Sequence, residues 1–289
     1  MKQIRFTFIP MRVSLIILIG IITTHSVSAQ LMQSFVHKGE WGISAGLGHY
    51  FGDLNNTAAI DRPKIAGGAF FRKQFNPYIS LRVFGNFTQL GYSDIYSTNT
   101  TQQRRNLSFN TNVFEAGVSG EFNFFLFNPQ FEEHSFTPYV GLGVSVFNFD
   151  PYAFLNDTKY FLRPLGTEGQ GSALYPDRKI YSPMALAFPI TLGYKHAINA
   201  RTNIFGEITY RFTNTDYLDD VSTTFAPDAF PPLPNGNPSI GFLLQDRSYE
   251  TGTAIGIRGR QRGNSTQKDA FFTFQIGISF NLSSYRCPE

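Results

Sequence analysis

The stretch AFFTFQIGISFNL, residues 270–282, alternates between apolar and polar side chains over its whole length. Successive side chains of a strand point to opposite faces, so this stretch has one apolar, aromatic face and one face of small polar residues. The apolar face comprises Phe272, Phe274, Ile276, Ile278, Phe280 and Leu282. Residues 41–51 divide in the same way. Such two-faced strands are typical of transmembrane barrels, and we predict that these first and last strands meet and close one.

Eight stretches with this alternation lie between residues 40 and 282, and an even number is what a bacterial outer-membrane barrel requires. We predict strands at 40–51, 65–75, 79–92, 107–127, 138–149, 185–197, 203–212 and 270–282. The connections alternate between short (76–78, 128–137, 199–202) and long (52–64, 93–106, 150–184, 213–269). Short turns belong in the periplasm and long loops outside the cell. The predicted fold class is therefore all-β, an eight-stranded antiparallel transmembrane barrel with long extracellular loops and both termini in the periplasm.

Composition and the first residues agree with an exported membrane protein. Aromatic residues reach 16% and charged residues only 16%, against about 25% charged residues in soluble domains. Residues 1–29 combine three basic residues, an apolar run at 13–22 and Val-Ser-Ala before Gln30, which is the pattern of a cleaved signal peptide. Removing those three from the 24 basic residues leaves 21, which balance the 21 acidic ones. The expected mature chain, 30–289, is then a barrel with a short periplasmic tail, in contact with outer-membrane lipids and without a nucleic-acid partner.

The alternation also predicts which charged side chains face the lumen. A basic residue facing lipid at the midplane costs about 2–4 kcal/mol, so the charged positions within the strands must point inward. The charged positions that we assign to the lumen are Arg82, Glu115, Glu121, Lys195, Glu207 and Arg211. The interior of an eight-stranded barrel is only wide enough to be filled by its own side chains, and buried charges need partners. We predict a luminal plug of ion pairs instead of an open channel.

The sequence offers little for catalysis. Four histidines of the mature chain are scattered, and no Ser or Asp lies in a nucleophile elbow. We therefore expect a protein that is not an enzyme and that holds no cofactor or metal. The Pro-rich stretch 226–238 is either a mobile loop tip or an extended ribbon that docks a partner.

The acidic run 216–220 contains Asp216, Asp219 and Asp220. These carboxylates could bind calcium, but the run lacks the spacing and the glycine of a calcium loop. We predict instead that they pair with Arg178 and Lys179 of the preceding long loop, so that the outer loops form a self-packed cap.

The single cysteine, Cys287, falls in the predicted periplasmic tail and has no second cysteine to pair with. The periplasm favours disulfides. An unpaired cysteine there is consistent with an inert thiol or with an intermolecular disulfide, and the residues alone leave both open.

Several blocks of the loops and the C-terminus are distinctive: YFGDL at 50–54, TEGQG at 167–171, YPDRK at 175–179, TDYLDDVS at 215–222 and CP at 287–288. From the first strand to the C-terminus the chain resembles the PorG-like outer-membrane barrels of Bacteroidetes. The resemblance implies a component of the type IX (Por) secretion system that joins a periplasmic ring made of the lipoprotein PorK and its partner PorN. It also favours a PorK-like lipoprotein as the disulfide partner of Cys287. The alternatives are a free-standing structural or adhesive barrel and an outer-membrane enzyme.

Overall fold

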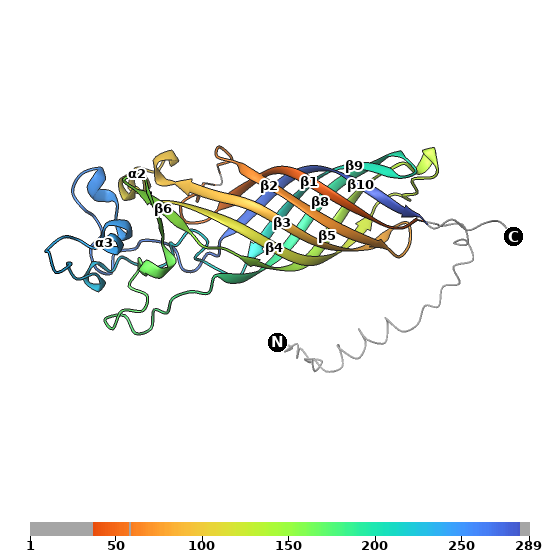
Figure 1. The fold of residues 1–289 in the computed structure, drawn as a ribbon. Helices are drawn as coiled ribbons and strands as arrows, with labels where there is room; N and C mark the ends of the chain where they lie inside the picture. The colour runs from red at the N-terminus through yellow and green to blue at the C-terminus, as the bar shows by residue number, and fades with distance from the viewer. Residues whose placement is uncertain (1–36, 58, 284–289) are drawn as a thin grey trace, which may run out of the picture. The chain divides into compact units, whose positions relative to one another are not determined.

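The computed structural model describes residues 37–57 and 59–283, so the predicted signal peptide and Cys287 lie outside the described residues. Eight long antiparallel strands close into a barrel (Figure 1). They are β1 (His37–Phe51), β2 (Lys64–Gln74), β3 (Ile79–Ser93), β4 (Ser108–Asn123), β5 (Phe136–Asn148), β8 (Met184–Asn199), β9 (Thr202–Thr213) and β10 (Ala270–Ser283). The pairing of β3 with both β2 and β4 completes the circle. The predicted all-β, eight-stranded antiparallel barrel is confirmed.

The first and last strands form the seam of the barrel, as predicted. β1 pairs with β10 from His37 opposite Ser283 to Phe51 opposite Ala270. On the outer face of this seam the rings of Trp41 and Phe280 lie with their centroids 4.8 Å apart. The seam is therefore a full-length strand pair like the others in the barrel.

The fourth strand ends earlier than the sequence predicts. β4 stops at Asn123, not at residue 127, and β5 begins at Phe136. The ladder breaks because the N–H of Phe125 donates to the Thr137 side-chain hydroxyl (3.0 Å) instead of to a main-chain carbonyl. The connection that follows contains a short 3-10 helix, η2 (Glu132–His134).

The predicted loop 150–184 contains a hairpin that the sequence analysis missed. Its strands are β6 (Tyr152–Leu155) and β7 (Thr158–Phe161), and β6 joins the barrel sheet where Tyr152 lies opposite Asn110 of β4. Asn156 and Asp157 between them have φ angles of 50° and 61°, which is the left-handed backbone of a two-residue hairpin turn. β7 is left as the free edge of the sheet.

The outer face of the barrel is an apolar belt with aromatic girdles at both ends. The girdle near the short turns includes Trp41, Phe136, Tyr194 and Phe280, and the girdle near the long loops includes Phe51, Tyr210, Phe212 and Phe272. Trp41 and Phe51 are ten residues apart on β1. Ten residues span about 33 Å along a strand, and a strand tilt of about 40° reduces this to about 25 Å along the barrel axis. That is the height of the belt of an outer-membrane barrel, and the protein is one.

Among the residues that the structure describes, no helix is both long enough and apolar enough to cross a membrane.

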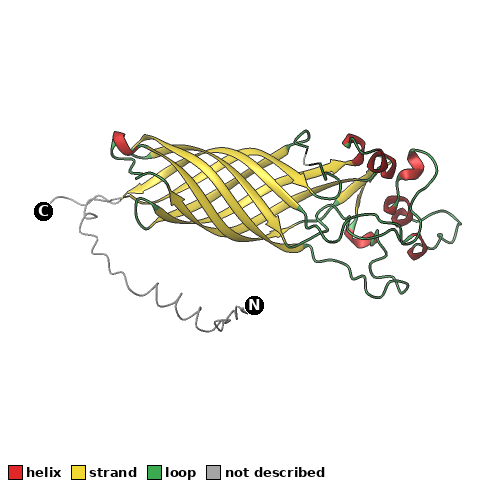
Figure 2. Ribbon diagram, turned by 180° about the vertical axis from the view of Figure 1, so that it is seen from behind, coloured by secondary structure: helices red, strands yellow, loops and turns green. Residues whose placement is uncertain are grey.

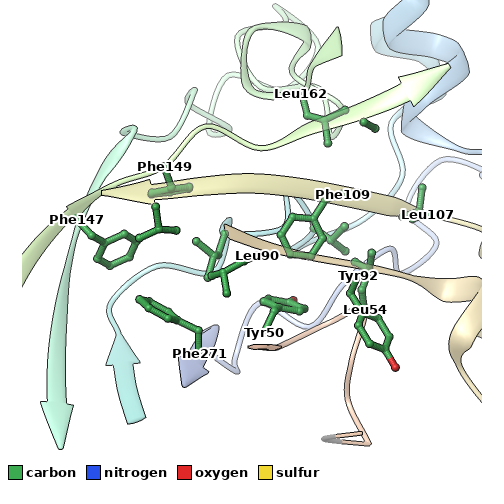
Figure 3. Packing of buried hydrophobic residues seen from close by; sticks show 14 of the residues in the cluster. Tyr50, Leu54, Leu90, Tyr92, Leu107, Phe109, Phe147, Phe149, Leu162 and Phe271 are labelled. Carbon is green, nitrogen blue, oxygen red and sulfur yellow. The ribbon is translucent and has the colours of Figure 1, made fainter. Parts of the chain in front are cut away.

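The long connections gather at one end of the barrel, which we call the loop end, and the short turns lie at the other, the turn end (Figure 2). The loop end carries η1 (Asp94–Tyr96), α2 (Thr100–Arg105), η3 (Arg163–Leu165), η4 (Pro227–Ala229), α3 (Ile240–Gln245) and η5 (Ser248–Glu250). An apolar cluster runs from the barrel interior into these loops and includes Tyr50, Phe109, Phe147, Phe149, Phe271 and Leu162 (Figure 3). The part of the lumen near the loop end is thus an ordinary hydrophobic core, in contrast to the expected polar lumen. We call the packed loops that cover it the cap.

Candidate functional site

The half of the lumen near the turn end is filled by a network of buried charges. The Arg72 guanidinium donates hydrogen bonds to the carboxylates of both Glu40 and Glu121, the latter also through Nη2 at 3.1 Å. Both Arg72 and Glu40 are fully buried. Glu40 also accepts hydrogen bonds from Asn203 (2.6 Å) and from the Ser279 hydroxyl (2.5 Å). Each charge therefore has several partners, as burial requires.

A second pair lies beside the first. Arg82 binds Glu207 through two parallel hydrogen bonds of 2.7 and 3.0 Å, a geometry that fixes both side chains. The Tyr139 hydroxyl donates to Glu207 at 2.6 Å. Arg82 also lies 3.6 Å from Glu121, so the two groups of charges form one continuous network.

Two further members of the predicted plug, Arg211 and Glu115, form a pair nearer the loop end. Arg211 donates to Glu115 at 2.8 Å and to the Thr273 hydroxyl at 2.9 Å. Glu115 further accepts a hydrogen bond from the Ser145 hydroxyl at 2.7 Å. This pair links β4 and β9 across the lumen.

All six predicted plug residues point inward and are buried, and Lys195 lies 3.8 Å from Glu40. With Glu40 and Arg72, the described strands bury four acidic and four basic side chains, so the lumen is electrically balanced. The sequence analysis did not assign these two, although the alternation beginning at Trp41 already places Glu40 inward. Arg72 was obscured because Phe70, which is buried, and Phe71, which is exposed, are adjacent. Packed side chains fill the lumen and close it as a plug.

The predicted pairing of the acidic run with Arg178 and Lys179 is wrong. Arg178 donates instead to the carbonyl oxygens of Glu168 (2.6 Å) and Thr224 (3.0 Å), and Lys179 is exposed. The basic partner of the run is Arg262, which lies 3.7 Å from Asp220. The physical reason is that the Arg178 guanidinium lies over the Tyr175 ring, 4.6 Å from its centroid, and faces main-chain carbonyls.

The three aspartates of the run are buried and rely mainly on hydroxyl donors. Asp216 accepts from the Ser222 hydroxyl and Asp219 from the Tyr50 hydroxyl, each at 2.5 Å. Asp220 accepts from the hydroxyls of Thr167 and Tyr181. The self-packed cap therefore exists, held by contacts other than the predicted ones.

Glu168, in the block TEGQG, is the centre of the cap and was not identified from the sequence. Its fully buried carboxylate accepts hydrogen bonds from the N–H groups of Ser222 (2.9 Å) and Thr223 (3.0 Å) and from the Thr223 hydroxyl (2.6 Å). Arg262 adds a charged hydrogen bond at 3.1 Å. One side chain thus joins the loop after β7 to the loop between β9 and β10.

The electrostatics of the cap favour protonated acids. Burial raises the pKa of Asp216 and of Asp220 to about 6. Burial raises the pKa of Asp219 and of Asp269 well above the ordinary value, and the charge of Asp219 raises that of Asp269 further. Within the described ranges, no cluster of three His, Cys, Asp or Glu residues has the arrangement of a metal site. The cluster can hold protons, and its geometry supports structural cohesion of the loops.

The cap is expected to lose stability as the pH rises through about 6. Asp216 and Asp220 have a pKa of about 6 in the folded cap and an ordinary value of 3.8. Between these values the folded cap binds more protons than the open one, so its stability is greatest below pH 3.8 and falls as the pH rises. Hydrogen exchange of the Val221 and Thr223 amides, corrected for intrinsic rates, measures this at about pH 4.5 and about pH 7.5.

Asp216→Asn is expected to reduce that pH dependence, and replacement of the exposed Asp177 by Asn is the matched control. Equal protection of the two amides at both pH values would contradict the prediction.

The sequence matches the family model described as a domain of unknown function, DUF6089, over residues 12–164, more than half of the chain. No curated protein matches it. Among solved structures it is similar to Neisserial surface protein A, NspA, with 9% identity and a TM-score of 0.41 over 84% of this chain and 97% of the other. It is also similar to Ail, the attachment invasion locus protein of Yersinia pestis (8%, 0.39, 86% and 99%), and to the outer membrane protein OprG from Pseudomonas aeruginosa (12%, 0.36, 86% and 99%).

Proposed function

This chain belongs to the DUF6089 family of domains of unknown function, and we propose that it is a non-enzymatic component of the type IX secretion system in the outer membrane. In this role the barrel anchors or positions a periplasmic ring of a PorK-like lipoprotein and a PorN-like partner. The resemblance of the loop blocks to PorG-like barrels supports the proposal. In the proposed arrangement the loop end is outside the cell and the turn end in the periplasm, because long loops of such barrels usually lie outside and short turns in the periplasm.

The observation that carries the proposal is the plugged lumen. Four acidic and four basic side chains are buried there. Salt bridges join them across the barrel, including the 3.8 Å contact between Lys195 and Glu40. A barrel filled in this way is suited to hold other components in place, because cargo has no path through it. The turn end offers a surface for such components: Phe75 and Phe131 are 63% and 53% exposed there, and Glu132 and Glu133 are exposed beside Phe131.

Deletion of the gene tests the proposal. We expect cargo of the secretion system to be lost from the medium and cell surface and to accumulate in the periplasm, with other outer-membrane proteins unchanged. A plasmid copy of the wild-type gene should restore secretion. A normal secretome in the deletion strain would contradict the proposal.

A mixed disulfide between Cys287 and the PorK-like lipoprotein is expected if the barrel is tied covalently to the ring. The periplasm favours disulfides, and the chain has no second cysteine. Non-reducing electrophoresis of native membranes should show a heavier species that collapses on reduction and is absent in Cys287→Ser. Identical migration of wild type and variant without reductant would leave docking to non-covalent contacts.

An adhesive barrel is the second candidate, and the hairpin β6–β7 favours it. Phe154 and Phe161 are 47% and 44% exposed on this hairpin, and the Lys159 ammonium lies 3.7 Å from the centroid of the Tyr152 ring. An exposed aromatic surface on a free sheet edge is suited to binding external partners. Normal secretion combined with loss of surface attachment in the deletion strain would favour this function.

A further inference from the structure

The rim of the barrel has a notch at the loop end, where β2 is shorter than its neighbours. β2 begins at Lys64, opposite Gly48 of β1, whereas β1 continues to Phe51 and β3 to Ser93. A pocket of about 410 Å³ occupies this notch and is lined in part by Arg62, Lys64, Tyr92 and Tyr96. It lies at the loop-end edge of the apolar belt, where the headgroups of the membrane lipids are placed.

Two cationic side chains in this pocket have N–H groups without a hydrogen-bond acceptor among the described residues. The Lys64 ammonium donates one hydrogen bond, to the side-chain oxygen of Asn110 at 2.6 Å. The Arg62 guanidinium lies 3.8 Å from the centroid of the Tyr96 ring. Within the described residues neither forms a salt bridge, and the neighbouring Asp61 accepts a hydrogen bond from the Tyr92 hydroxyl at 3.4 Å. The notch therefore presents an excess of positive charge with several free N–H groups.

An apolar hollow of about 640 Å³ lies on the outer face of the same strands, nearer the membrane centre. Its floor is made by the small residues Gly67, Gly85 and Ala116, and its walls include Phe87, Phe114 and Met184. Gly67 follows Lys64 by three residues on β2, which corresponds to about 10 Å along the strand. A molecule that reaches from the notch into the hollow would thus have a polar end at the rim and an apolar chain within the belt.

We propose that this face binds one anionic lipid of the leaflet at the loop end, with its phosphate on Arg62 and Lys64 and one acyl chain in the hollow. With the loop end outside the cell, this is the outer leaflet. The occupant follows from the surroundings: the hollow lies within the belt, where the solvent is lipid, and basic side chains at a membrane rim recognise phosphate-bearing headgroups. The site is separate from the proposed docking surface at the turn end, and Glu115 of the plug is among the residues that line the hollow.

Native mass spectrometry of the full mature protein in a mild detergent tests the proposal, with phosphatidic acid and phosphatidylcholine of identical acyl chains as probes. We expect phosphatidic acid to be retained as a single bound molecule and phosphatidylcholine to be lost. The double variant Arg62→Ala/Lys64→Ala should weaken retention about 30-fold, because each basic residue near an anionic surface contributes about 1 kcal/mol. Lys73→Ala is the matched control, since Lys73 is exposed at the opposite end of the same strand.

The hollow is tested separately with Gly85→Leu, which fills its floor. A Cβ at Gly85 meets its first neighbour at 3.9 Å, so the backbone accepts the change. Gly120→Leu is the control. Gly120, on β4, is exposed like Gly85 and has open space around it, but it is not among the residues that line the hollow. Only Gly85→Leu should reduce lipid retention.

Three results would overturn the proposal: equal retention of the two lipids, unchanged retention in the double variant, or equal effects of the two glycine substitutions. Full displacement of the lipid by millimolar inorganic phosphate would also overturn it, because the site would then bind a free anion with no contribution from the acyl chain. The heat-induced gel shift of each variant shows that its barrel is folded, so that loss of retention is read as loss of the site.

Discussion

Replacement of Arg72 by methionine is expected to lower the free energy of unfolding of the barrel by about 3 to 5 kcal/mol, the usual cost of removing one partner from a buried ion pair. The Arg72 guanidinium bonds both Glu40 and Glu121, and all three side chains are buried. Methionine fills similar space but leaves two carboxylates with one cation fewer. The lumen would then carry an unbalanced negative charge away from water.

Urea unfolding in lipid vesicles measures this change, with the fluorescence of Trp41, the single tryptophan, as the probe. Lys73→Met is the matched control, because Lys73 is the exposed neighbour on the same strand, and we expect it to change stability by less than about 0.5 kcal/mol. The double variant Glu40→Gln/Arg72→Met restores the charge balance and should recover part of the loss. An unfolding midpoint for Arg72→Met equal to that of the wild type would show that the network does not stabilise the barrel.

Replacement of Ile276 by arginine is expected to destabilise the inserted barrel by about 2 to 4 kcal/mol. Ile276 is 61% exposed on the outer face of β10 and lies opposite Ala45 and Gly206, in the middle of the belt. A guanidinium at this depth is surrounded by hydrocarbon and has no luminal partner. The same vesicle unfolding experiment gives the free energy.

Depth provides the control for this second prediction. Leu282 is 43% exposed on the same face of β10, at its turn end, where arginine costs only about 0 to 1 kcal/mol. The difference between Ile276→Arg and Leu282→Arg therefore measures the effect of the membrane centre. Equal losses of stability for the two variants would mean that Ile276 does not lie nearer the membrane centre than Leu282.

The long strands could be predicted closely because alternation is a strong signal over ten or more residues. β10 was expected at 270–282 and is found at Ala270–Ser283. The same alternation predicted the inward side of the plug, since lipid excludes charge. It gave no position for Arg72, where two adjacent phenylalanines obscure the pattern, and it extended the fourth strand into a turn.

The cap could not be predicted in the same way, because its contacts depend on how four connections meet in space. β6 has only four residues, too few for alternation to stand out from chance, although the Asn156-Asp157 pair is a recognisable hairpin turn. The acidic run is buried in the packed cap, but its charged partner is Arg262, 42 positions further along the chain than Asp220. Sequence separation carries no information about which arginine reaches a given carboxylate.

The seam between β1 and β10 affects how this barrel assembles and whether lipid or polypeptide can pass between these strands. Hydrogen bonds cross it inside the barrel at three levels: the Ser279 hydroxyl to Glu40 (2.5 Å), the Ser44 hydroxyl to Gln275 (2.5 Å) and the Tyr50 hydroxyl to Asp269 (3.1 Å). A lateral gate, through which lipid or polypeptide slips between the first and last strands, would have to break all three together with the main-chain ladder. These bonds form only after the last strand has paired with the first. They are therefore made at the end of assembly and then oppose any opening of the seam.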